Sequence, residues 1–317
     1  ASEGRFDYLL IESTGISEPM PVAATFLFED IDGQSLSSLA RLDTMATVVD
    51  AATFLDRFAH LEELTDLGVG RDEEDDRSVV DLVVDQVEFA NVIAISKPDL
   101  VSPQHLEKVV AMVRRLNPDA RLVVAENGNV PLEAVLDTGL FDEVEGEAAP
   151  GWAQILNDEV TPETEEYGIT SFVYRHRWPF HPKGLSRELN EAWPGVLRSK
   201  GFFWIASRPD MQAMWSHAGL SVMLEPLAPW YVSTPEDEWD LETDEERAEL
   251  MERWDPLLGD RQTEIVFIGI DMDEDAIRRR LDACILTGRE FEKGPEKWLK
   301  FRDPLPEWDL SCDLELE

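Results

Sequence analysis

Residues 6–19, Phe-Asp-Tyr-Leu-Leu-Ile-Glu-Ser-Thr-Gly-Ile-Ser-Glu-Pro, form the stretch around which the fold is predicted to be organised. Tyr8–Ile11 is a short apolar run, typical of a strand buried on both faces of a parallel sheet. The run ends at Glu12, and a turn leads to a helix expected to begin near Pro19. Ligands of open α/β sheets bind at the carboxyl ends of strands, so Glu12 is placed to hold Mg²⁺ and Gly15 to contact a phosphate. The alternative is an ordinary strand followed by a turn.

Length and charge restrict the class of protein. At 317 residues the chain is long enough for two domains, and its net charge is −39. This excess of Asp and Glu argues against a nucleic-acid partner or an anionic membrane, and it suits a protein kept soluble at high ionic strength. Cys284 and Cys312 lie far apart and indicate neither a disulfide framework nor a zinc ribbon. Without a membrane-span or signal-peptide pattern, the sequence predicts a cytoplasmic protein.

Strand and helix patterns alternate through the first half. Buried strands are predicted at Thr44–Val49 and Asn91–Ile95, in addition to Tyr8–Ile11, and a fourth strand is predicted at Arg121–Ala125. Helices are predicted at Met20–Phe28, Ala51–Leu64, Val79–Phe89, from Ser102 to Leu116, and briefly at Leu132–Leu136. This alternation predicts a parallel α/β sheet over residues 1–141.

The second half has a different pattern. Residues 142–166 are acidic and poor in apolar side chains, which indicates a linker, and residues 167–317 are predicted to form a smaller α+β domain with a mostly antiparallel sheet. Its expected strands are Ile169–Tyr174, Gly201–Ala206, Ser221–Leu224 and Thr263–Ile270. Its expected helices are Leu185–Trp193, one running from a capping box at Thr243 to Arg253, and one through Ile277, Leu281 and Ile285 that ends at Gly288. Four tryptophans, at 193, 204, 215 and 230, are expected in its core.

Ser96-Lys97-Pro98-Asp99-Leu100 follows the predicted strand at 91–95. The carboxylate of Asp99 can accept hydrogen bonds from N1–H and the 2-amino group of guanine, a donor pair that adenine lacks. The aliphatic stem of Lys97 can lie along the base. A Lys-x-Asp triplet is also common in loops, but its place at a strand end, level with Glu12 and Asp50, favours the nucleotide interpretation.

Several motifs resemble the CobW-type GTPases, a family of metal chaperones. In the first half they are Glu-Ser-Thr-Gly-Ile-Ser-Glu-Pro at 12–19, Thr-Val-Val-Asp-Ala at 47–51, Asp-Gln-Val-Glu at 85–88 and Asn-Pro-Asp-Ala at 117–120. In the second half they are Trp-Pro-Phe-His-Pro at 178–182, Arg-Ser-Lys-Gly-Phe-Phe-Trp at 198–204 and the strand Ile265–Gly269. The motifs agree in order and spacing over essentially the whole chain.

The resemblance implies a GTP-dependent chaperone that uses GTP and Mg²⁺ and delivers a divalent metal, Zn²⁺ or Co²⁺, to a metal-requiring client protein. It implies an incomplete P-loop NTPase sheet in residues 1–141 and a CobW-type C-terminal domain in residues 167–317. Glu12 is the expected catalytic and Mg²⁺-binding residue. The expected nucleotide-contacting residues are Thr14, Gly15, Ser96, Lys97, Asp99 and Gly128.

The chain also departs from the family pattern. The motifs Gly-x-x-Gly-x-Gly-Lys-Thr/Ser and Cys-x-Cys-Cys do not occur in it, and Ser96 stands where guanine-binding proteins commonly have asparagine. Without backbone N–H groups and a lysine around the phosphates, residues 1–317 alone are expected neither to bind GTP tightly nor to hydrolyse it. An unpaired sheet edge would favour self-association. The alternative function is a non-catalytic interaction protein, built from an eroded GTPase half and a client-binding C-terminal domain.

Histidines are the remaining candidates for binding the transported metal. His176 and His181 lie five residues apart around Trp178-Pro179. A histidine beside proline and aromatic residues more often packs than ligates, so a structural role is the alternative for both.

Overall fold

The computed structural model describes residues 7–13, 15, 18–27, 36, 40–59, 78–141, 168–241 and 243–308. The predicted acidic linker at 142–166 therefore lies outside the described residues, as does Thr14. The chain divides into two compact units. The first is Ala1–Ile169 with Ala218–Ser221, and the second is Thr170–His217 with Val222–Glu317.

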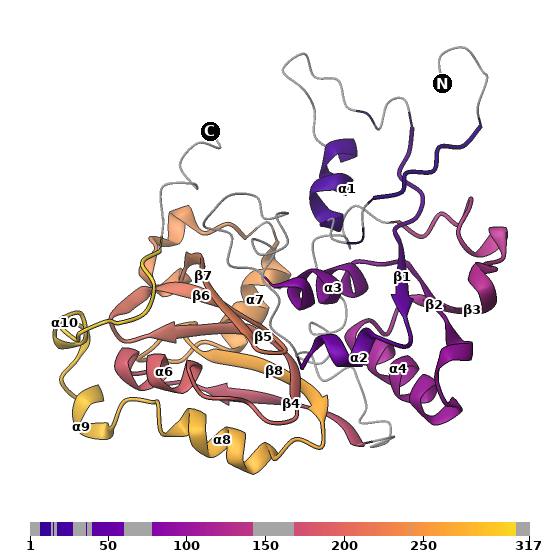
Figure 1. The fold of residues 1–317 in the computed structure, drawn as a ribbon. Helices are drawn as coiled ribbons and strands as arrows, with labels where there is room; N and C mark the ends of the chain where they lie inside the picture. Colours follow the sequence, from indigo (N-terminus) through magenta and orange to yellow (C-terminus); the bar gives the residue numbers. More distant parts are fainter. Residues whose placement is uncertain are drawn as a thin grey trace. The chain divides into compact units, whose positions relative to one another are not determined.

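The first unit contains a parallel sheet with the order β1-β2-β3 (Figure 1). Its strands are β1 (Ala46–Asp50), β2 (Val92–Ser96) and β3 (Arg121–Ala125). Val92 lies opposite Ala46 on one side and Arg121 on the other, so the three strands are in register along their whole length. The predicted strands at these three places and their parallel arrangement are confirmed. Of the three, only β2 is buried along most of its length; the expectation of a buried strand is wrong for β1, where Val48 is 71% exposed.

Helices α1 (Pro19–Leu27), α2 (Phe54–Arg57), α3 (Val79–Glu88) and α4 (Pro103–Leu116) complete this unit. The hydroxyl of Ser78 accepts the N–H of Asp81 at the start of α3, and that of Ser102 accepts the N–H of His105 at the start of α4. Of the helix predicted at Ala51–Leu64, the described part is helical only in α2, which is therefore shorter than predicted. Short 3₁₀ turns at Glu126–Gly128 and Leu132–Ala134 follow β3.

One buried asparagine joins the ends of α3 and α4. Asn117, 1% exposed, caps α4, and its amide nitrogen donates to the carbonyls of Val87, Glu88 and Ala90 at 2.8–3.1 Å. Its side-chain oxygen accepts the N–H of Ala120 at 3.0 Å. This one side chain hydrogen-bonds to carbonyls at the end of α3, where backbone partners are few, and it positions the turn into β3.

The expectation of a buried strand at Tyr8–Ile11 is wrong. These residues form no strand in the structure, and Leu9, Leu10 and Ile11 are 66%, 77% and 51% exposed. A strand needs a neighbour for its backbone N–H and C=O groups, and the described sheet pairs β1 only with β2. An apolar run becomes a buried strand only when a neighbouring strand pairs with its backbone and other elements cover its side chains.

The second unit is built on a five-stranded sheet of order β4-β8-β5-β6-β7. The strands are β4 (Ile169–His176), β5 (Val196–Ile205), β6 (Arg208–Ala218), β7 (Ser221–Pro229) and β8 (Thr263–Ile270). The central pair, β5 and β8, is antiparallel, with Gly201 opposite Ile265. The prediction of an α+β arrangement with a mostly antiparallel sheet is confirmed.

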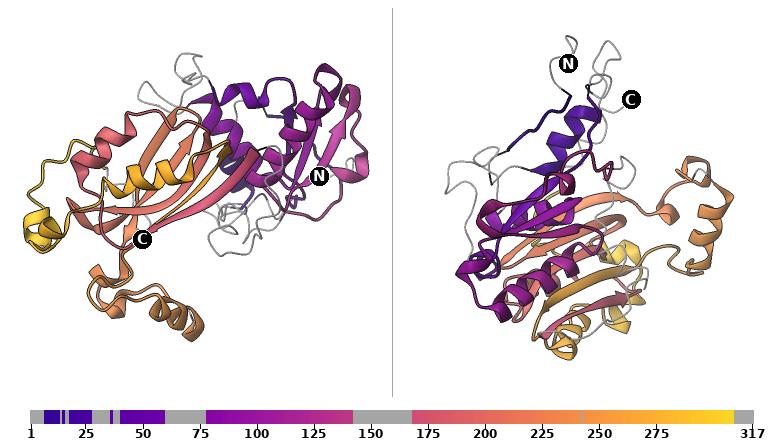
Figure 2. Two further views of the ribbon diagram at one scale, coloured as in Figure 1. Left: turned by 90° about the horizontal axis from the view of Figure 1, so that it is seen from below. Right: turned by 90° about the vertical axis from the view of Figure 1, so that its right-hand side faces the viewer.

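Helices α6 (Pro182–Leu189) and α8 (Glu274–Asp282) cover one face of this sheet (Figures 1 and 2). Leu185 of α6 and Leu281 of α8 pack with Phe203, Trp215 and Phe267 of the strands in one core cluster. The four tryptophans predicted in the core are all buried, at 7% exposure or less. Short helices α9 (Gly288–Phe291) and α10 (Pro295–Trp298) follow α8, and α7 (Asp244–Glu252) lies between β7 and β8.

Several elements of this unit differ from prediction. Strands β5 and β7 are longer than predicted, and α6 ends at Leu189 instead of Trp193. Strand β6 was not predicted, because it begins with Arg-Pro-Asp at 208–210 and its apolar residues are interrupted by Gln212 and Ser216. Helix α6 begins at Pro182 and not at Leu185, since the ring of His181 caps it by accepting the N–H of Lys183. The last long helix ends at Asp282, and Gly288 starts α9 instead of ending α8. The capped helix at Thr243 is confirmed as α7.

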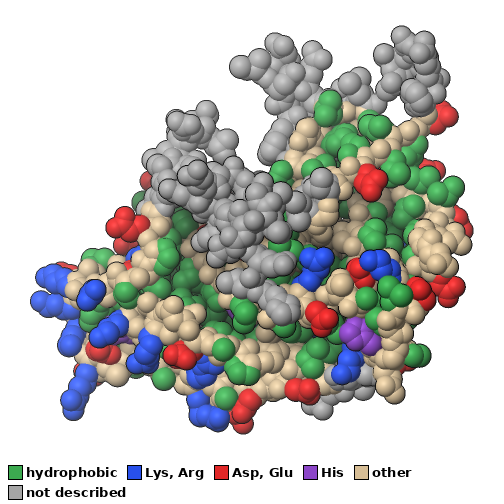
Figure 3. Space-filling model, in the orientation of Figure 1, with side chains coloured by type: hydrophobic (Ala, Val, Ile, Leu, Met, Phe, Trp, Pro, Cys, Tyr) green, Lys and Arg blue, Asp and Glu red, His purple; other side chains and the backbone are tan. Residues whose placement is uncertain are grey.

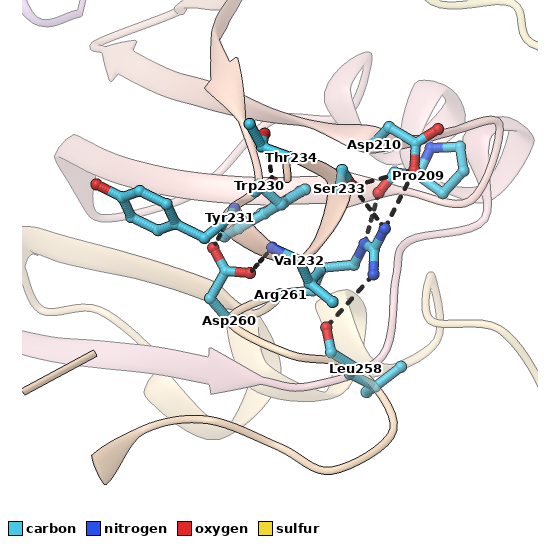
Figure 4. Close-up of polar contacts among 10 residues, drawn as sticks. All are labelled: Pro209, Asp210, Trp230, Tyr231, Val232, Ser233, Thr234, Leu258, Asp260 and Arg261. Atoms are coloured by element: carbon cyan, nitrogen blue, oxygen red, sulfur yellow. Dashed lines mark hydrogen bonds and ion pairs between the residues drawn. The ribbon is translucent and has the colours of Figure 1, made fainter. Parts of the chain in front are cut away.

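Arg261 connects three segments of this unit (Figure 4). Its guanidinium donates to the carbonyls of Pro209 and Leu258 and to Ser233 Oγ, at 2.7–3.5 Å, and pairs with Asp210 at 3.1 Å. The neighbouring Asp260 accepts the N–H groups of Tyr231 and Val232 at 2.9 and 3.0 Å. These two side chains hold the segment after β7 against the start of β6.

No helix among the described residues is long and apolar enough to cross a membrane.

Candidate functional site

The carboxyl ends of the three parallel strands lie side by side in the first unit. Asp50 of β1 lies opposite Ser96 of β2, and Ser96 lies opposite Ala125 of β3. The residues that follow each strand are therefore brought to one edge of the sheet, where α/β proteins bind ligands. This edge carries the predicted residues Ser96, Lys97, Asp99 and Gly128.

Lys97 is held by an ion pair that the sequence analysis did not predict. Its ammonium donates to Asp50 Oδ2 at 2.6 Å, and the other oxygen of Asp50 accepts the N–H of Ala52 at 2.9 Å. Burial alone would raise the pKa of Asp50, but the hydrogen bonds from Lys97 and Ala52 lower it below its usual value. The sequence does place an acid, Asp50, at the end of the predicted strand at 44–49. That position is the sequence feature that indicates the ion pair with Lys97.

The backbone at Lys97 is unusual. Its φ of 56° and ψ of 40° lie in the left-handed region, which non-glycine residues rarely occupy. The loop is held on both sides, because Ser96 Oγ donates to the carbonyl of Val49 at 3.2 Å and the N–H of Ala51 donates to the carbonyl of Ser96 at 3.0 Å. The ring of His105 in α4 contacts the carbonyl of Ala51 at 3.1 Å. Rare backbone geometry that is fixed in this way concentrates at binding sites.

Asp99 and Gly128 remain exposed at this edge. Within the described chain, the carboxylate of Asp99 forms no hydrogen bond or ion pair, so both oxygens are available to a ligand. Gly128 has a φ of 74° and follows Asn127, which has a φ of 52°. A side chain at Gly128 would meet no atom within 4 Å, so the surface there is open.

The segment predicted to bind Mg²⁺ and phosphate is exposed. Among the described residues, the carboxylate of Glu12 forms no hydrogen bond or ion pair with Asp50 or Lys97. Gly15 is also exposed, and its carbonyl accepts a hydrogen bond from the amide of Gln86 in α3 at 3.2 Å. The structure thus brings Ser96 and Lys97 to the same edge of the sheet as Gly128, which follows the neighbouring strand.

His176 and His181 have different partners in the second unit. Nδ1 of His176 accepts the N–H of Trp178 at 3.0 Å. Nδ1 of His181 accepts the N–H of Lys183, and its ring lies 4.8 Å from that of Phe301. No group of three or more His, Cys, Asp or Glu side chains able to hold a metal ion occurs among the described residues.

The edge of the first unit fits the base of a guanine nucleotide. It offers an unpaired carboxylate at Asp99 and a lysine whose stem is fixed by Asp50. Guanine presents the two adjacent donors that such a carboxylate accepts. The described residues provide no glycine-rich loop for the phosphates, so this fit concerns the base alone.

Asp43 connects three segments of the first unit, and the sequence analysis did not single it out. It is 8% exposed and accepts hydrogen bonds from the hydroxyls of Tyr8 and Thr44 and from the N–H groups of Thr138 and Gly139, at 2.7–3.1 Å. Burial alone would raise the pKa of Asp43, but these hydrogen bonds outweigh it and lower the pKa to about 2.

Replacing Asp43 by asparagine is expected to reduce the free energy of unfolding at pH 7 by about 2 kcal/mol. Because the folded pKa of Asp43, about 2, lies below the ordinary value of 3.8 that applies in the unfolded chain, this stabilisation is complete above about pH 3.8. It is lost as the pH falls toward 2, so wild type and variant should converge there. Urea titrations at several pH values measure the difference. Asp56→Asn, at an exposed position, is the control, and a difference that does not depend on pH would contradict the assignment.

Each half of the chain matches a known protein family. Residues 1–124 match the CobW/HypB/UreG nucleotide-binding domain, and residues 169–285 match the cobalamin synthesis protein cobW C-terminal domain. The zinc-regulated GTPase metalloprotein activator 1 of Dictyostelium discoideum is 42% identical over 326 residues, which cover all of this chain. The zinc chaperone Rv0106 of Mycobacterium tuberculosis is 29% identical over 86% of the chain. The zinc chaperone CobW of a Sinorhizobium species is 29% identical over 65% of it.

The similar segments include residues of both units of this chain, but they cover only part of the length of each related protein. The chain spans 66% of the length of the Dictyostelium protein, 63% of the mycobacterial protein and 58% of the Sinorhizobium protein. The two matching domains occur here in the order that the sequence motifs predicted. The chain therefore belongs to the CobW family, with the nucleotide-binding domain in its first half and the family's C-terminal domain in its second.

Proposed function

We propose that this chain belongs to a GTP-dependent metal chaperone that delivers zinc to a metal-requiring client protein. The observation that carries the proposal is the edge of the parallel sheet, where Asp50 holds Lys97 and the carboxylate of Asp99 stays exposed. The names of the related proteins, a zinc-regulated GTPase metalloprotein activator and two zinc chaperones, favour zinc over cobalt as the transported metal.

In this proposal the base lies against the loop at 96–100. Asp99 accepts the N1–H and 2-amino donors of guanine, and the stem of Lys97 lies along the ring. Ser96, whose hydroxyl is bonded to the carbonyl of Val49, braces the loop where asparagine is common in other guanine-binding proteins. Gly128 leaves open space next to the ribose or base.

Glu12, Thr14 and Gly15 serve the other end of the nucleotide in this proposal. Glu12 holds Mg²⁺ and orients the attacking water, and Thr14 and Gly15 contact the terminal phosphate. Most affinity for a nucleoside triphosphate comes from backbone N–H groups, a lysine and Mg²⁺ around its phosphates. Residues 1–317 alone are therefore expected to bind GTP weakly, and any zinc would be bound outside the described residues or with a partner.

The test is the nucleotide preference of Asp99→Asn in the protein expressed from its complete reading frame. The amide should weaken GTP binding by roughly 10- to 100-fold, since one charge-assisted hydrogen bond contributes about 1.5–3 kcal/mol. It should also improve binding of xanthosine triphosphate, whose 2-oxo group accepts from an amide. Isothermal titration with both nucleotides and Mg²⁺ measures the preference.

Glu133→Gln, at an exposed position in the same unit, is the matched control and should bind GTP as the wild type does. An unchanged ratio of the two affinities in Asp99→Asn would remove Asp99 from the base site. If neither wild type nor variant binds a nucleoside triphosphate, the non-catalytic interaction protein becomes the better interpretation.

A further inference from the structure

Basic side chains gather on one part of the second unit, although the whole chain has 67 Asp and Glu against 28 Lys and Arg. Four of the seven lysines occur in two short segments there, the start of α6 and residues 288–302. Figure 3 shows Lys and Arg side chains concentrated on the side of the molecule that carries α8, α9 and α10 in Figure 1. We call this the basic surface. It comprises Lys183, Arg289, Lys293, Lys297, Lys300 and Arg302.

These six side chains are exposed and unpaired. Within the part of the chain that the structure describes, none of them forms a hydrogen bond or a salt bridge. Three other arginines of this unit differ, because Arg278 pairs with Glu274, Arg280 with Glu188 and Arg208 with Asp303. The basic surface therefore presents charge that its own unit does not neutralise.

The acidic residues in the same segments compensate only part of this charge. Glu290 caps α9, where its carboxylate accepts the N–H and the hydroxyl of Thr287 at 2.9 and 2.7 Å. Between residues 288 and 302, only Glu292 and Glu296 remain as exposed acids without a hydrogen bond or salt bridge, against five basic side chains. This area is thus locally positive on a strongly negative protein.

The basic surface stands on a rigid aromatic base. The rings of Trp178 and Phe291 stack at 4.3 Å, and Trp298, 3% exposed, donates its indole N–H to the carbonyl of Glu290 at 2.8 Å. The ring of Phe301 lies 4.8 Å from that of His181, which brings the start of α6 next to residues 297–302. A surface fixed in this way loses little conformational entropy when it binds a partner.

An apolar side chain stands among these charges. Leu299 is 58% exposed and lies between Lys297 and Lys300 in the sequence. An exposed apolar residue with a charged rim resembles the centre of a protein interface. It would contact an apolar side chain of a partner, and the surrounding lysines would pair with carboxylates.

We propose that the basic surface binds a short acidic segment of another polypeptide that also carries apolar side chains. The positive charge of the basic surface favours a ligand with carboxylate groups. The exposed side chain of Leu299 favours a polypeptide over inorganic phosphate, because only a polypeptide offers an apolar side chain to contact it. A long polyanion such as nucleic acid would meet the repulsion of the whole protein, whereas a short segment senses mainly charges within about 10 Å. The proposal does not depend on nucleotide or metal binding and so stands apart from the proposed function.

The experiment measures fluorescence anisotropy of labelled synthetic peptides with residues 1–317. The probe is a dodecapeptide of repeated Glu-Glu-Leu, compared with polyglutamate and with repeated Gln-Gln-Leu of equal length. The probe should bind most tightly, and raising the salt from about 50 mM to about 500 mM should weaken it strongly. The Gln-Gln-Leu peptide should bind weakly at both salt concentrations.

Charge reversal locates the site. A triple variant that combines Lys297→Glu, Lys300→Glu and Arg302→Glu should weaken binding of the probe by roughly 10-fold or more. The matched control is a second triple variant that reverses exposed arginines outside the basic surface: Arg114→Glu, Arg121→Glu and Arg253→Glu. It changes the net charge by the same amount and should alter binding less than about threefold. Leu299→Ser should reduce the preference for the probe over polyglutamate. Thermal unfolding verifies that each variant is folded.

Three results would overturn the proposal. One is an equal loss of peptide binding in the two triple variants, which would mean that binding depends on the net charge of the protein and not on the basic surface. Another is binding of polyglutamate that equals the probe in wild type and in Leu299→Ser. The third is tighter binding of a single-stranded DNA dodecamer than of the peptide, which would identify a different class of ligand.

Discussion

Replacing Gly201 by alanine is expected to prevent stable folding of the second unit. Gly201 lies in the middle of β5, opposite Ile265 of β8. A Cβ atom there would lie 2.0 Å from the carbonyl oxygen of Glu264 and 2.8 Å from the Cα of Ile265. Both are backbone atoms of the paired strand, so no side-chain rotation relieves the overlap.

The cost should exceed about 4 kcal/mol, because the central β5–β8 pairing must move or break. Urea unfolding followed by the fluorescence of the buried tryptophans measures it. Gly288→Ala is the matched control, since a Cβ at that position would meet no atom within 4 Å. A Gly201→Ala protein within about 1 kcal/mol of wild type would show that the two strands can separate without loss of stability.

The second large effect is expected at Arg261. Its side chain is 16% exposed and makes the four contacts described above, and its guanidinium also lies over the ring of Trp204 at 5.7 Å. Asp210 is 71% exposed, so that ion pair contributes little. The contacts with the carbonyls and Ser233 are more protected and account for most of the effect.

Arg261→Met keeps much of the aliphatic stem and removes the donors. It should lower the free energy of unfolding of the second unit by about 2–4 kcal/mol. It should also expose the segment after β7 to limited proteolysis, because the link to Pro209 is lost. Arg253→Met, at an exposed position, is the control. An equal protease sensitivity of the two variants would contradict the role assigned to Arg261.

Elements with a strong local signal were predictable. The strand at Val92–Ser96 lies in an apolar run rich in isoleucine and valine, and α4 has a serine cap and a proline at its first position. The strand at Thr263–Ile270 is buried at seven of its eight positions and was predicted with its observed bounds. Such segments carry the information for their own conformation within a few residues.

Elements whose conformation depends on distant partners were predicted less well. The apolar run Tyr8–Ile11 has the composition of a strand but no strand beside it, and β6 looks polar although Trp215 is fully buried. Ile285 continues the apolar spacing of α8, yet the helix has already ended at Asp282. In each case the deciding interaction comes from residues far away in the sequence.

The candidate site shows the same division. The sequence by itself determined the parallel and antiparallel sheets, the family and the loop at 96–100, because each rests on local patterns and motif spacing. Only the tertiary structure decided that Asp50 holds Lys97 and that the carboxylate of Asp99 has no partner among the described residues. The pairing of β1 with β2 brings Asp50 next to Ser96, although the two residues are 46 positions apart in the sequence. A local sequence pattern cannot predict a pairing between residues so far apart.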